Sequence, residues 1–77
     1  MDKVLYLDID AMRQILTPDA FAVYMSDMVY SVYIVLTSAG TFHYQLYDTN
    51  TGDVEQVFYS TKELNIYYLR KGETENV

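Results

Sequence analysis

The sequence predicts a small α+β domain: an antiparallel sheet of three or four strands packed against short helices, in the order α-α-β-β-β-α. Three observations lead to this fold class. The central segments 29–37 and 41–48 are rich in β-branched and aromatic residues, as strands are. Helix-capping patterns precede residues 18 and 61. Finally, 77 residues with 51% hydrophobic composition suffice for one core and argue against disorder.

The N-terminal segment fits two kinds of element. Alternate apolar residues from Leu5 to Ile9 are typical of a strand, whereas an apolar stripe from Leu5 to Leu16 is typical of a helix. We favour a helix for the second half, with Asp8 or Asp10 as its N-cap. Strand and helix both remain open for the residues before that cap.

A second short helix is predicted from Pro18 to about Ser26. Thr17 can cap its first turn, and Pro18 suits the first helical position. Asp19 then lies near the positive end of the helix dipole, where a carboxylate is favourable.

The two central segments are predicted to form a hairpin whose register follows from their apolar residues. Matching apolar to apolar sets Leu36 opposite Phe42 and Ile34 opposite Tyr44. This register requires a loop with an odd number of residues, and a three-residue loop ending at Gly40 in the left-handed conformation meets that condition. The opposite face then carries six residues: Ser31, Tyr33, Val35, His43, Gln45 and Tyr47.

A third strand is predicted from Val54 to Tyr59, after a turn at 48–53. Its facing stays open, because either Val57 and Tyr59 or Val54 and Phe58 can point inward. Both facings leave an aromatic ring on the outer face, near the single histidine.

The last predicted helix begins after Ser60, which forms a capping box with Glu63. Leu64, Tyr67 and Tyr68 follow at the spacing that places one face on a sheet.

Gly72 is predicted to end this helix, because glycine is the usual residue just past a helix C-terminus. We therefore expect a single domain over residues 1–72 and a disordered tail over residues 73–77.

Several classes of protein are disfavoured by composition. The chain has no cysteine, so it has no disulfide and no thiolate ligand or nucleophile. It has one histidine, no apolar run long enough for a membrane span, and no signal-peptide pattern. We expect a soluble cytoplasmic protein without a membrane partner, located in the host cytoplasm if a phage encodes it.

Negative charge is concentrated in the first 61 residues. The formal net charge is −6, from eleven Asp and Glu against five Lys and Arg. Residues 14–61 contain neither Lys nor Arg, whereas the charges from residue 62 onward balance. Direct binding to nucleic acid phosphates needs the opposite sign, so we expect none.

The segment VLYLDIDAM, residues 4–12, resembles the first motif of the haloacid dehalogenase-type phosphohydrolases. The resemblance implies Asp8 as nucleophile and Asp10 as proton carrier. However, Ala11 stands where the family usually has glycine, the chain lacks the family's downstream acidic pair, and it is too short for a doubly wound sheet. We therefore expect both aspartates to cap or decorate a helix, and a phosphohydrolase-like enzyme remains a remote alternative.

Two further patterns have simpler structural explanations. The acidic turn at 48–53 is similar to a calcium loop, but its glycine is fifth rather than sixth and Tyr59 takes the twelfth position. His43 has no nucleophile at a recognisable spacing. We predict no catalytic residue, no metal site and no cofactor.

Tyrosine is the residue that points most directly to a binding role. The chain has nine tyrosines, and the hairpin register places Tyr33 and Tyr47 on the outer face. Tyrosine is favoured at interfaces because its large amphipathic ring is fixed at little entropic cost. The predicted partner-binding residues are these two tyrosines and four acidic residues close to the hairpin in sequence: Tyr33, Tyr47, Asp48, Asp53, Glu55 and Asp27.

The leading hypothesis is a non-enzymatic binding protein that acts as a stoichiometric inhibitor. Its acidic, tyrosine-bearing surface would dock into the basic groove of a nucleic-acid-binding protein, and nucleic-acid mimicry is one form of this. Its size and charge resemble those of small phage or mobile-element proteins that act against host defence, including anti-CRISPR and anti-restriction proteins. The alternative is a generic protein–protein module, or a homodimer that pairs through the outer face.

Overall fold

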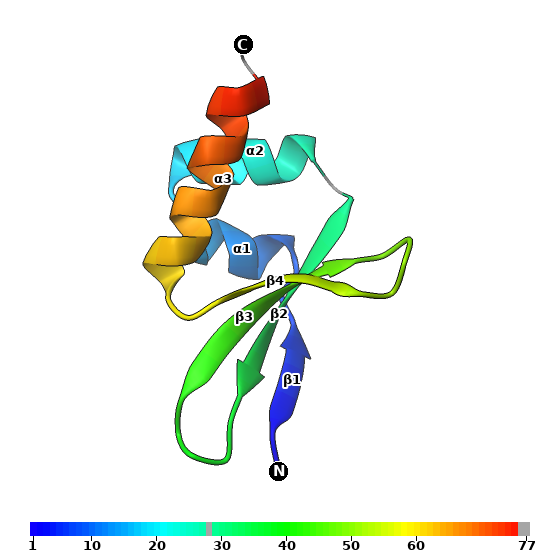
Figure 1. Cartoon of the computed structure of the whole chain (residues 1–77). Coiled ribbons are helices and arrows are strands. Elements are labelled where there is room, and N and C mark those ends of the chain that lie inside the picture. The colour runs from blue at the N-terminus through cyan, green and yellow to red at the C-terminus, as the bar shows by residue number, and fades with distance from the viewer. Residues whose placement is uncertain (28, 76–77) are drawn as a thin grey trace.

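The computed structural model describes residues 1–27 and 29–75 and shows a four-stranded antiparallel sheet with helices on one side (Figure 1). The elements in chain order are β1 (Lys3–Tyr6), α1 (Ile9–Ile15), α2 (Pro18–Ser26), β2 (Tyr30–Leu36), β3 (Phe42–Asp48), β4 (Val54–Phe58) and α3 (Thr61–Glu75). The strands lie in the sheet in the order β1-β2-β3-β4. The predicted α+β class is confirmed, and the fourth strand is the N-terminal one.

The N-terminal segment is a strand followed by a helix. β1 pairs antiparallel with β2, with Tyr6 opposite Tyr33. Leu7 then enters the core, and Asp8 caps α1 by accepting a hydrogen bond from the amide of Ala11 at 2.9 Å. The strand interpretation therefore holds before the cap and the helix interpretation holds after it.

The predicted second helix is confirmed with its cap. The hydroxyl of Thr17 accepts a hydrogen bond from the amide of Ala20 at 3.3 Å, and Pro18 takes the first turn. α2 runs to Ser26 as predicted.

The register of the hairpin is also confirmed. Leu36 lies opposite Phe42 and Ile34 lies opposite Tyr44. Gly40 adopts a φ of +85° at the end of the three-residue loop, where a residue with a Cβ would be strained.

A β-bulge decides the facing of β4. Phe58 lies opposite the core residue Tyr44 and points inward, whereas Val57 lies opposite Gln45 and points outward. The register shifts next to Tyr47, so Val54 returns to the outer face. Neither predicted facing is fully correct, because both assumed an unbroken alternation along the strand.

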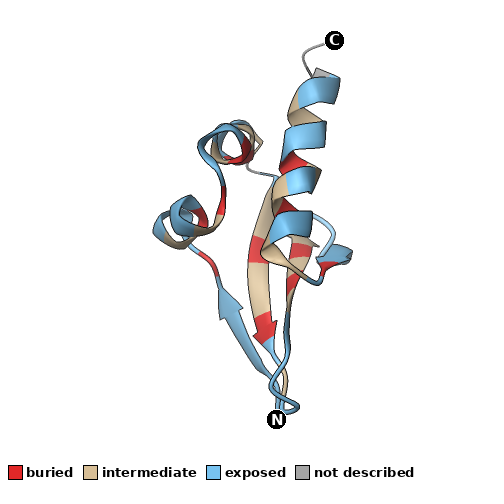
Figure 2. Ribbon diagram, turned by 90° about the vertical axis from the view of Figure 1, so that its left-hand side faces the viewer, coloured by how far each residue is buried: buried red, intermediate tan, exposed pale blue. Residues whose placement is uncertain are grey.

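One hydrophobic core fills the layer between the helices and the inner face of the sheet (Figure 2). Its buried residues come from all three helices, from β2, β3 and β4, and from the segment after β1: Leu7, Met12, Leu16, Ala20, Tyr24, Val32, Tyr44, Leu46, Phe58, Leu64 and Tyr68.

The side chain of Asn65 joins α3 to the junction between α1 and α2. Its Oδ1 accepts a hydrogen bond from the amide of Thr17 at 2.8 Å. Its Nδ2 donates to the carbonyls of Ile15 at 3.2 Å and Thr61 at 2.9 Å. One side chain thus satisfies backbone groups left free where α1 ends and α2 begins.

The start of α3 agrees with the predicted capping box. The hydroxyl of Ser60 accepts from the amide of Glu63 at 3.1 Å, and the Glu63 carboxylate accepts from the amide of Tyr59 at 2.6 Å. Within the described part of the chain, no helix combines the length and the apolar character needed to cross a membrane.

The prediction that Gly72 ends α3 is wrong, because the helix continues to Glu75. A Cβ built on Gly72 would lie 2.6 Å from Cγ2 of Val23 on α2. The glycine therefore serves a close helix–helix contact rather than a C-cap. Of the predicted tail at 73–77, the first three residues belong to the helix, and 76–77 lie outside the described residues.

Replacing Gly72 tests this contact. In an unobstructed helix interior, alanine is about 1 kcal/mol more stable than glycine. Here we expect Gly72→Ala to lower the free energy of unfolding by about 1 kcal/mol or more, because the new methyl group overlaps Val23. Chemical denaturation of the single variants and of the Val23→Ala, Gly72→Ala double variant would measure the coupling. Additive effects of the two substitutions would contradict the contact.

The hydroxyl of Tyr68 is buried without a hydrogen-bond partner among the described residues. Its ring packs edge-on against the ring of Tyr24, with 5.8 Å between centroids, so the apolar part of the side chain makes a favourable aromatic contact. Burial raises the pKa of Tyr68 above its ordinary value, with smaller contributions from the neighbouring tyrosines. Tyr44 differs, because its hydroxyl lies 3.0 Å from that of Thr61.

We expect Tyr68→Phe to keep or raise the free energy of unfolding at neutral pH, since it removes an unpaired polar atom. Tyr44→Phe is the matched control and should cost about 0.5–1.5 kcal/mol, because it breaks a hydrogen bond.

The stabilities of these variants should depend differently on pH in the alkaline range. Above pH ~10 the unfolded chain loses its tyrosine protons while folded Tyr68 keeps its own, so stability falls as pH rises. Tyr68→Phe should reduce that fall in denaturant titrations from pH ~8 to ~11. An unchanged slope would contradict the burial of this hydroxyl.

Candidate protein-binding face of the sheet

The face of the sheet that points away from the helices, here called the outer face, is defined by the strand register. It carries residues from all four strands and the residue that follows β4: Val4, Tyr6, Ser31, Tyr33, Val35, His43, Gln45, Tyr47, Val54, Val57 and Tyr59. The helices of the described chain gather on the other side (Figures 1 and 2). None of the outer-face residues is Asp, Glu, Lys or Arg, although the chain has a net charge of −6.

Three tyrosines form a contiguous ladder across β1, β2 and β3. The ring centroids of Tyr6 and Tyr33 are 5.5 Å apart at an interplanar angle of 63°, and those of Tyr33 and Tyr47 are 5.8 Å apart at 77°. These edge-to-face contacts are a favoured geometry for aromatic pairs. The predicted anchors Tyr33 and Tyr47 therefore lie in contact, and each ring restricts its neighbour.

The outer face has a packed centre and exposed flanks. Val35, in the centre, is only 4% exposed although it faces away from the helices. Tyr6 and Tyr59, on the flanks, are 57% and 70% exposed. The face is therefore a preformed apolar surface whose outermost rings are available for contact.

His43 lies beside Tyr59, with ring centroids 5.9 Å apart. The predicted aromatic neighbour of His43 is thus Tyr59. The Nε2 atom of His43 lies 3.3 Å from Nε2 of Gln45. The contact with Tyr59 joins the two rings, and Gln45 is an amide, so neither neighbour offers His43 an orienting carboxylate.

The acidic turn between β3 and β4 lies at the Tyr47 end of the outer face. The carboxylate of Asp48 accepts hydrogen bonds from the amides of Asn50 at 2.8 Å and Thr51 at 3.3 Å, which is an Asx turn. A Cβ on Gly52 would lie 3.5 Å from the Tyr47 hydroxyl, so that ring reaches over the turn.

Asp53 and Glu55, on the β4 side of the same turn, are exposed. The Asp48 carboxylate is occupied by the turn's own amides, and no group of three or more potential metal ligands occurs among the described residues. Asp48, Asp53 and Glu55 therefore form an acidic rim at the β3–β4 end of the sheet, where Asp48 lies opposite Tyr30.

Asp27 lies in a different environment. It ends α2 and forms an ion pair with Lys71 of α3, in which the two side chains are 15% and 22% exposed. The Lys71 ammonium also lies 4.8 Å from the centre of the Tyr30 ring. Burial lowers the pKa of Lys71, but the hydrogen bond with Asp27 and nearby negative groups raise it above its usual value overall. Asp27 thus joins two helices instead of extending the acidic rim.

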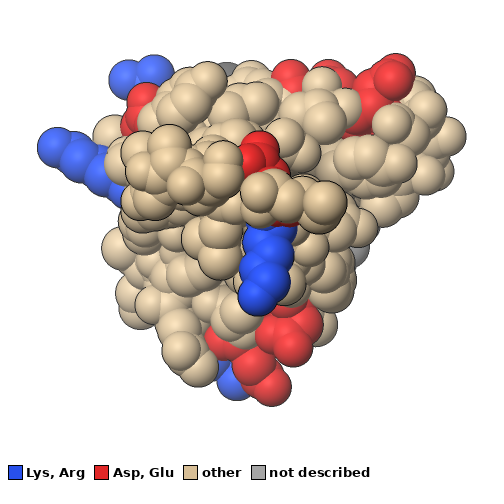
Figure 3. Space-filling model, turned by 90° about the horizontal axis from the view of Figure 1, so that it is seen from below, with Lys and Arg blue, Asp and Glu red and all other residues tan. Residues whose placement is uncertain are grey.

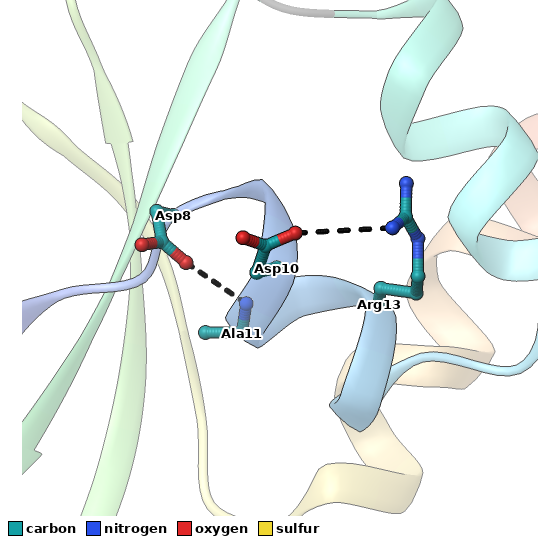
Figure 4. A network of polar contacts seen from close by, with 4 residues as sticks. All are labelled: Asp8, Asp10, Ala11 and Arg13. Atoms are coloured by element: carbon teal, nitrogen blue, oxygen red, sulfur yellow. Dashed lines mark hydrogen bonds and ion pairs between the residues drawn. The ribbon is translucent and has the colours of Figure 1, made fainter.

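The two aspartates of the N-terminal motif also separate (Figure 4). Asp8 points to the amide of Ala11, whereas Asp10 pairs with Arg13 at 3.8 Å on the exposed side of α1. Capping and a surface ion pair account for both side chains, as expected for a helix start.

An open groove of about 770 Å³ runs between β4 and α3. Phe58, Ile66 and Tyr67 form its apolar wall, with Arg70 and Glu63 among its charged groups. Its lining includes neither histidine nor cysteine.

The surface charge is distributed in separate groups. Seen from the end of the sheet opposite the helices, acidic side chains form several clusters, and large areas between them are uncharged (Figure 3). On this side of the molecule the acidic groups therefore do not form one continuous stripe.

Comparison with known proteins adds no relative. The chain matches no protein-family model, and searches of characterised proteins and of solved structures found no significant match.

Sequence reasoning missed two contributors to the outer face, Val4 and Tyr6. Their signal was their alternation with Leu5 and Leu7, which was present but equally compatible with a helix. Tyr59 was one of two candidates, and the pairing of Phe58 with Tyr44 decided between them.

Proposed function

We propose that this protein is a non-enzymatic binding protein that acts as a stoichiometric inhibitor of a basic, nucleic-acid-binding protein. One observation carries the proposal: an uncharged aromatic sheet face, free of helix cover in the described chain, ends at an acidic rim. The outer face would contact the partner, and the rim would meet its basic groups.

The composition of the outer face supports a role as the centre of an interface. Interface centres are depleted in charged residues and enriched in tyrosine, while their margins are polar. The ladder of Tyr6, Tyr33 and Tyr47 fits that pattern. Because the rings already restrict one another, little conformational entropy remains to be lost on binding.

The charge of the chain supports a basic partner. Residues 14–61, which include β2, β3 and the acidic rim, contain no Lys or Arg. Negative charge at this density steers association toward a positive surface. A nucleic-acid-binding groove is a surface of that sign, and occupying it would exclude the nucleic acid. In this arrangement the tyrosines would contribute most of the affinity, and the charges would speed association and orient the two proteins.

The size and charge of the chain support a setting in which a phage or mobile element uses the protein against a host defence system. Capture of partners from bacterial lysates, with and without nuclease, would test it. A basic protein retained after nuclease treatment would support the proposal. Capture that depends on nucleic acid would contradict it.

Tyrosine substitutions test the contact surface. With the captured partner, Tyr33→Ala and Tyr47→Ala should each weaken binding by more than about 1 kcal/mol, or at least about fivefold in Kd. Tyr59→Ala should also weaken binding, and it should leave the fold intact because its ring is largely exposed. Leu69→Ala, an exposed apolar truncation on α3, is the matched control and should not change Kd. If all four variants bind equally well in calorimetry, the outer face is not the interface.

Charge reversal tests the acidic rim. Asp53→Lys and Glu55→Lys should slow association and flatten its dependence on salt, because they remove attraction to a basic partner. Glu73→Lys changes the net charge equally but lies on α3, away from the rim. Stopped-flow or surface-based kinetics at low and high salt would compare them. Equal slowing by all three variants would show that net charge, not the rim, governs association.

A second candidate is a homodimer in which two outer faces pack together. The observation that favours it is the lack of charged residues on this face, so that two copies meet without like-charge repulsion. Sedimentation would discriminate, because this dimer should dissociate when Tyr59 is replaced by Lys. A monomer at about tens of micromolar would count against it.

A further inference from the structure

The outer edge of β1 is unusual for a soluble protein. β1 is a terminal strand of the sheet, and in the described chain only β2 pairs with it. Val4 and Tyr6 are exposed on the outer face, and Leu5 is 46% exposed on the inner face. Natural edge strands are usually protected by charges, prolines or bulges. This strand is apolar on both faces and has Lys3 as its one charged residue.

The unpaired backbone groups of this edge can be assigned from a single hydrogen bond. The amide of Leu7 donates to the carbonyl of Val32 on β2 at 3.0 Å. Backbone direction alternates along an antiparallel strand, so Lys3, Leu5 and Leu7 direct their N–H and C=O groups toward β2. Val4 and Tyr6 therefore direct theirs to the free edge.

We propose that β1 pairs antiparallel with β1 of a second copy, about a two-fold axis at Leu5, to form an eight-stranded sheet. Val4 of each copy then lies opposite Tyr6 of the other and exchanges backbone hydrogen bonds with it. Leu5 lies opposite Leu5 of the second copy. Residues opposite each other share a face, so this register keeps both outer faces on the same side of the sheet.

Competing registers are less favourable. A shift by one residue would set Val4 of one copy opposite Leu5 of the other, which mismatches the faces. Centring the pair on Val4 would set Tyr6 opposite Asp2, and centring it on Tyr6 would set Val4 opposite Asp8, which caps α1. The register centred on Leu5 matches apolar to apolar at Val4, Leu5 and Tyr6, and it sets Lys3 opposite Leu7. This self-complementarity identifies the occupant as a second copy.

The paired strands are short, so the dimer should be weak. Stable interfaces usually bury about 1,600 Å² in total, and two four-residue strands bury less. The pairing leaves the outer face free, and it joins two tyrosine ladders side by side through Tyr6. It is thus independent of the proposed inhibitor function and distinct from face-to-face packing.

A single cysteine tests the geometry directly, since the natural chain has none. Residues directly opposite in a non-hydrogen-bonded pair have Cα atoms about 4.5 Å apart, within the range that a disulfide spans. Leu5→Cys should therefore oxidise rapidly to a covalent dimer that retains the native circular dichroism spectrum. Phe42→Cys is the control, because Phe42 has similar exposure and lies two strands from the axis. Equal rates of cross-linking in the two variants would overturn the proposal.

Sedimentation of the uncross-linked protein provides the second readout. The natural chain should show a reversible monomer–dimer equilibrium, and Leu5→Lys should be monomeric because it sets two like charges opposite each other. Tyr59→Lys, on the far side of the outer face, should still dimerise. The proposal is overturned if the natural chain is monomeric at about 500 µM, or if Tyr59→Lys dissociates the dimer and Leu5→Lys does not. Measuring how the captured partner binds Leu5→Lys would test the proposed inhibitor function separately from pairing through β1.

Discussion

Helices of seven, nine and fifteen residues cover one face of the four-stranded sheet, and most features of the molecule depend on this one-sided cover. The core is a single layer between the helices and the inner face, and inner-face residues beyond the helices, such as Leu5 and Phe42, stay partly exposed. The outer face must remain stable in contact with water. Tyrosine suits that face because its ring packs against neighbouring strands while its hydroxyl remains hydrated. The four outer-face tyrosines that suggest binding therefore also suit a sheet face that no helix covers.

The cover itself depends on two long-range polar contacts of α3. Asn65 bonds the junction of α1 and α2, and Lys71 pairs with Asp27 at the end of α2. Asn65 satisfies backbone groups at helix ends that lack partners within the helix, whereas the ion pair joins the side chains of Lys71 and Asp27. Short helices have a large share of such backbone groups, so each is only marginally stable in isolation. The close approach at Gly72 completes the docking of α3 on α2.

The sequence predicted the elements that local rules determine and missed those that tertiary contacts determine. The hairpin register followed from side-chain parity, and the caps of α2 and α3 from their residue types. β1 stayed ambiguous because a four-residue strand fits a helical stripe equally well. The end of α3 was wrong because Gly72 is explained by Val23, 49 positions earlier in the chain. Likewise, the grouping of Asp27 with the other acids could not anticipate Lys71, whereas the contact between Tyr33 and Tyr47 was implicit in the register.

The two margins of the outer face differ in kind, and this difference constrains any partner. One margin is the free backbone edge of β1, and the other ends at the acidic rim between β3 and β4. A partner on one copy must therefore place its basic groups toward the β3–β4 turn. If two copies join at β1, the two-fold axis sends the rims to opposite ends of the strands, and six strand spacings of about 4.8 Å separate the two β3–β4 turns. A partner that engages both rims must then present two basic sites more than roughly 29 Å apart in an untwisted sheet. A symmetric dimer meets that requirement with one basic site in each copy.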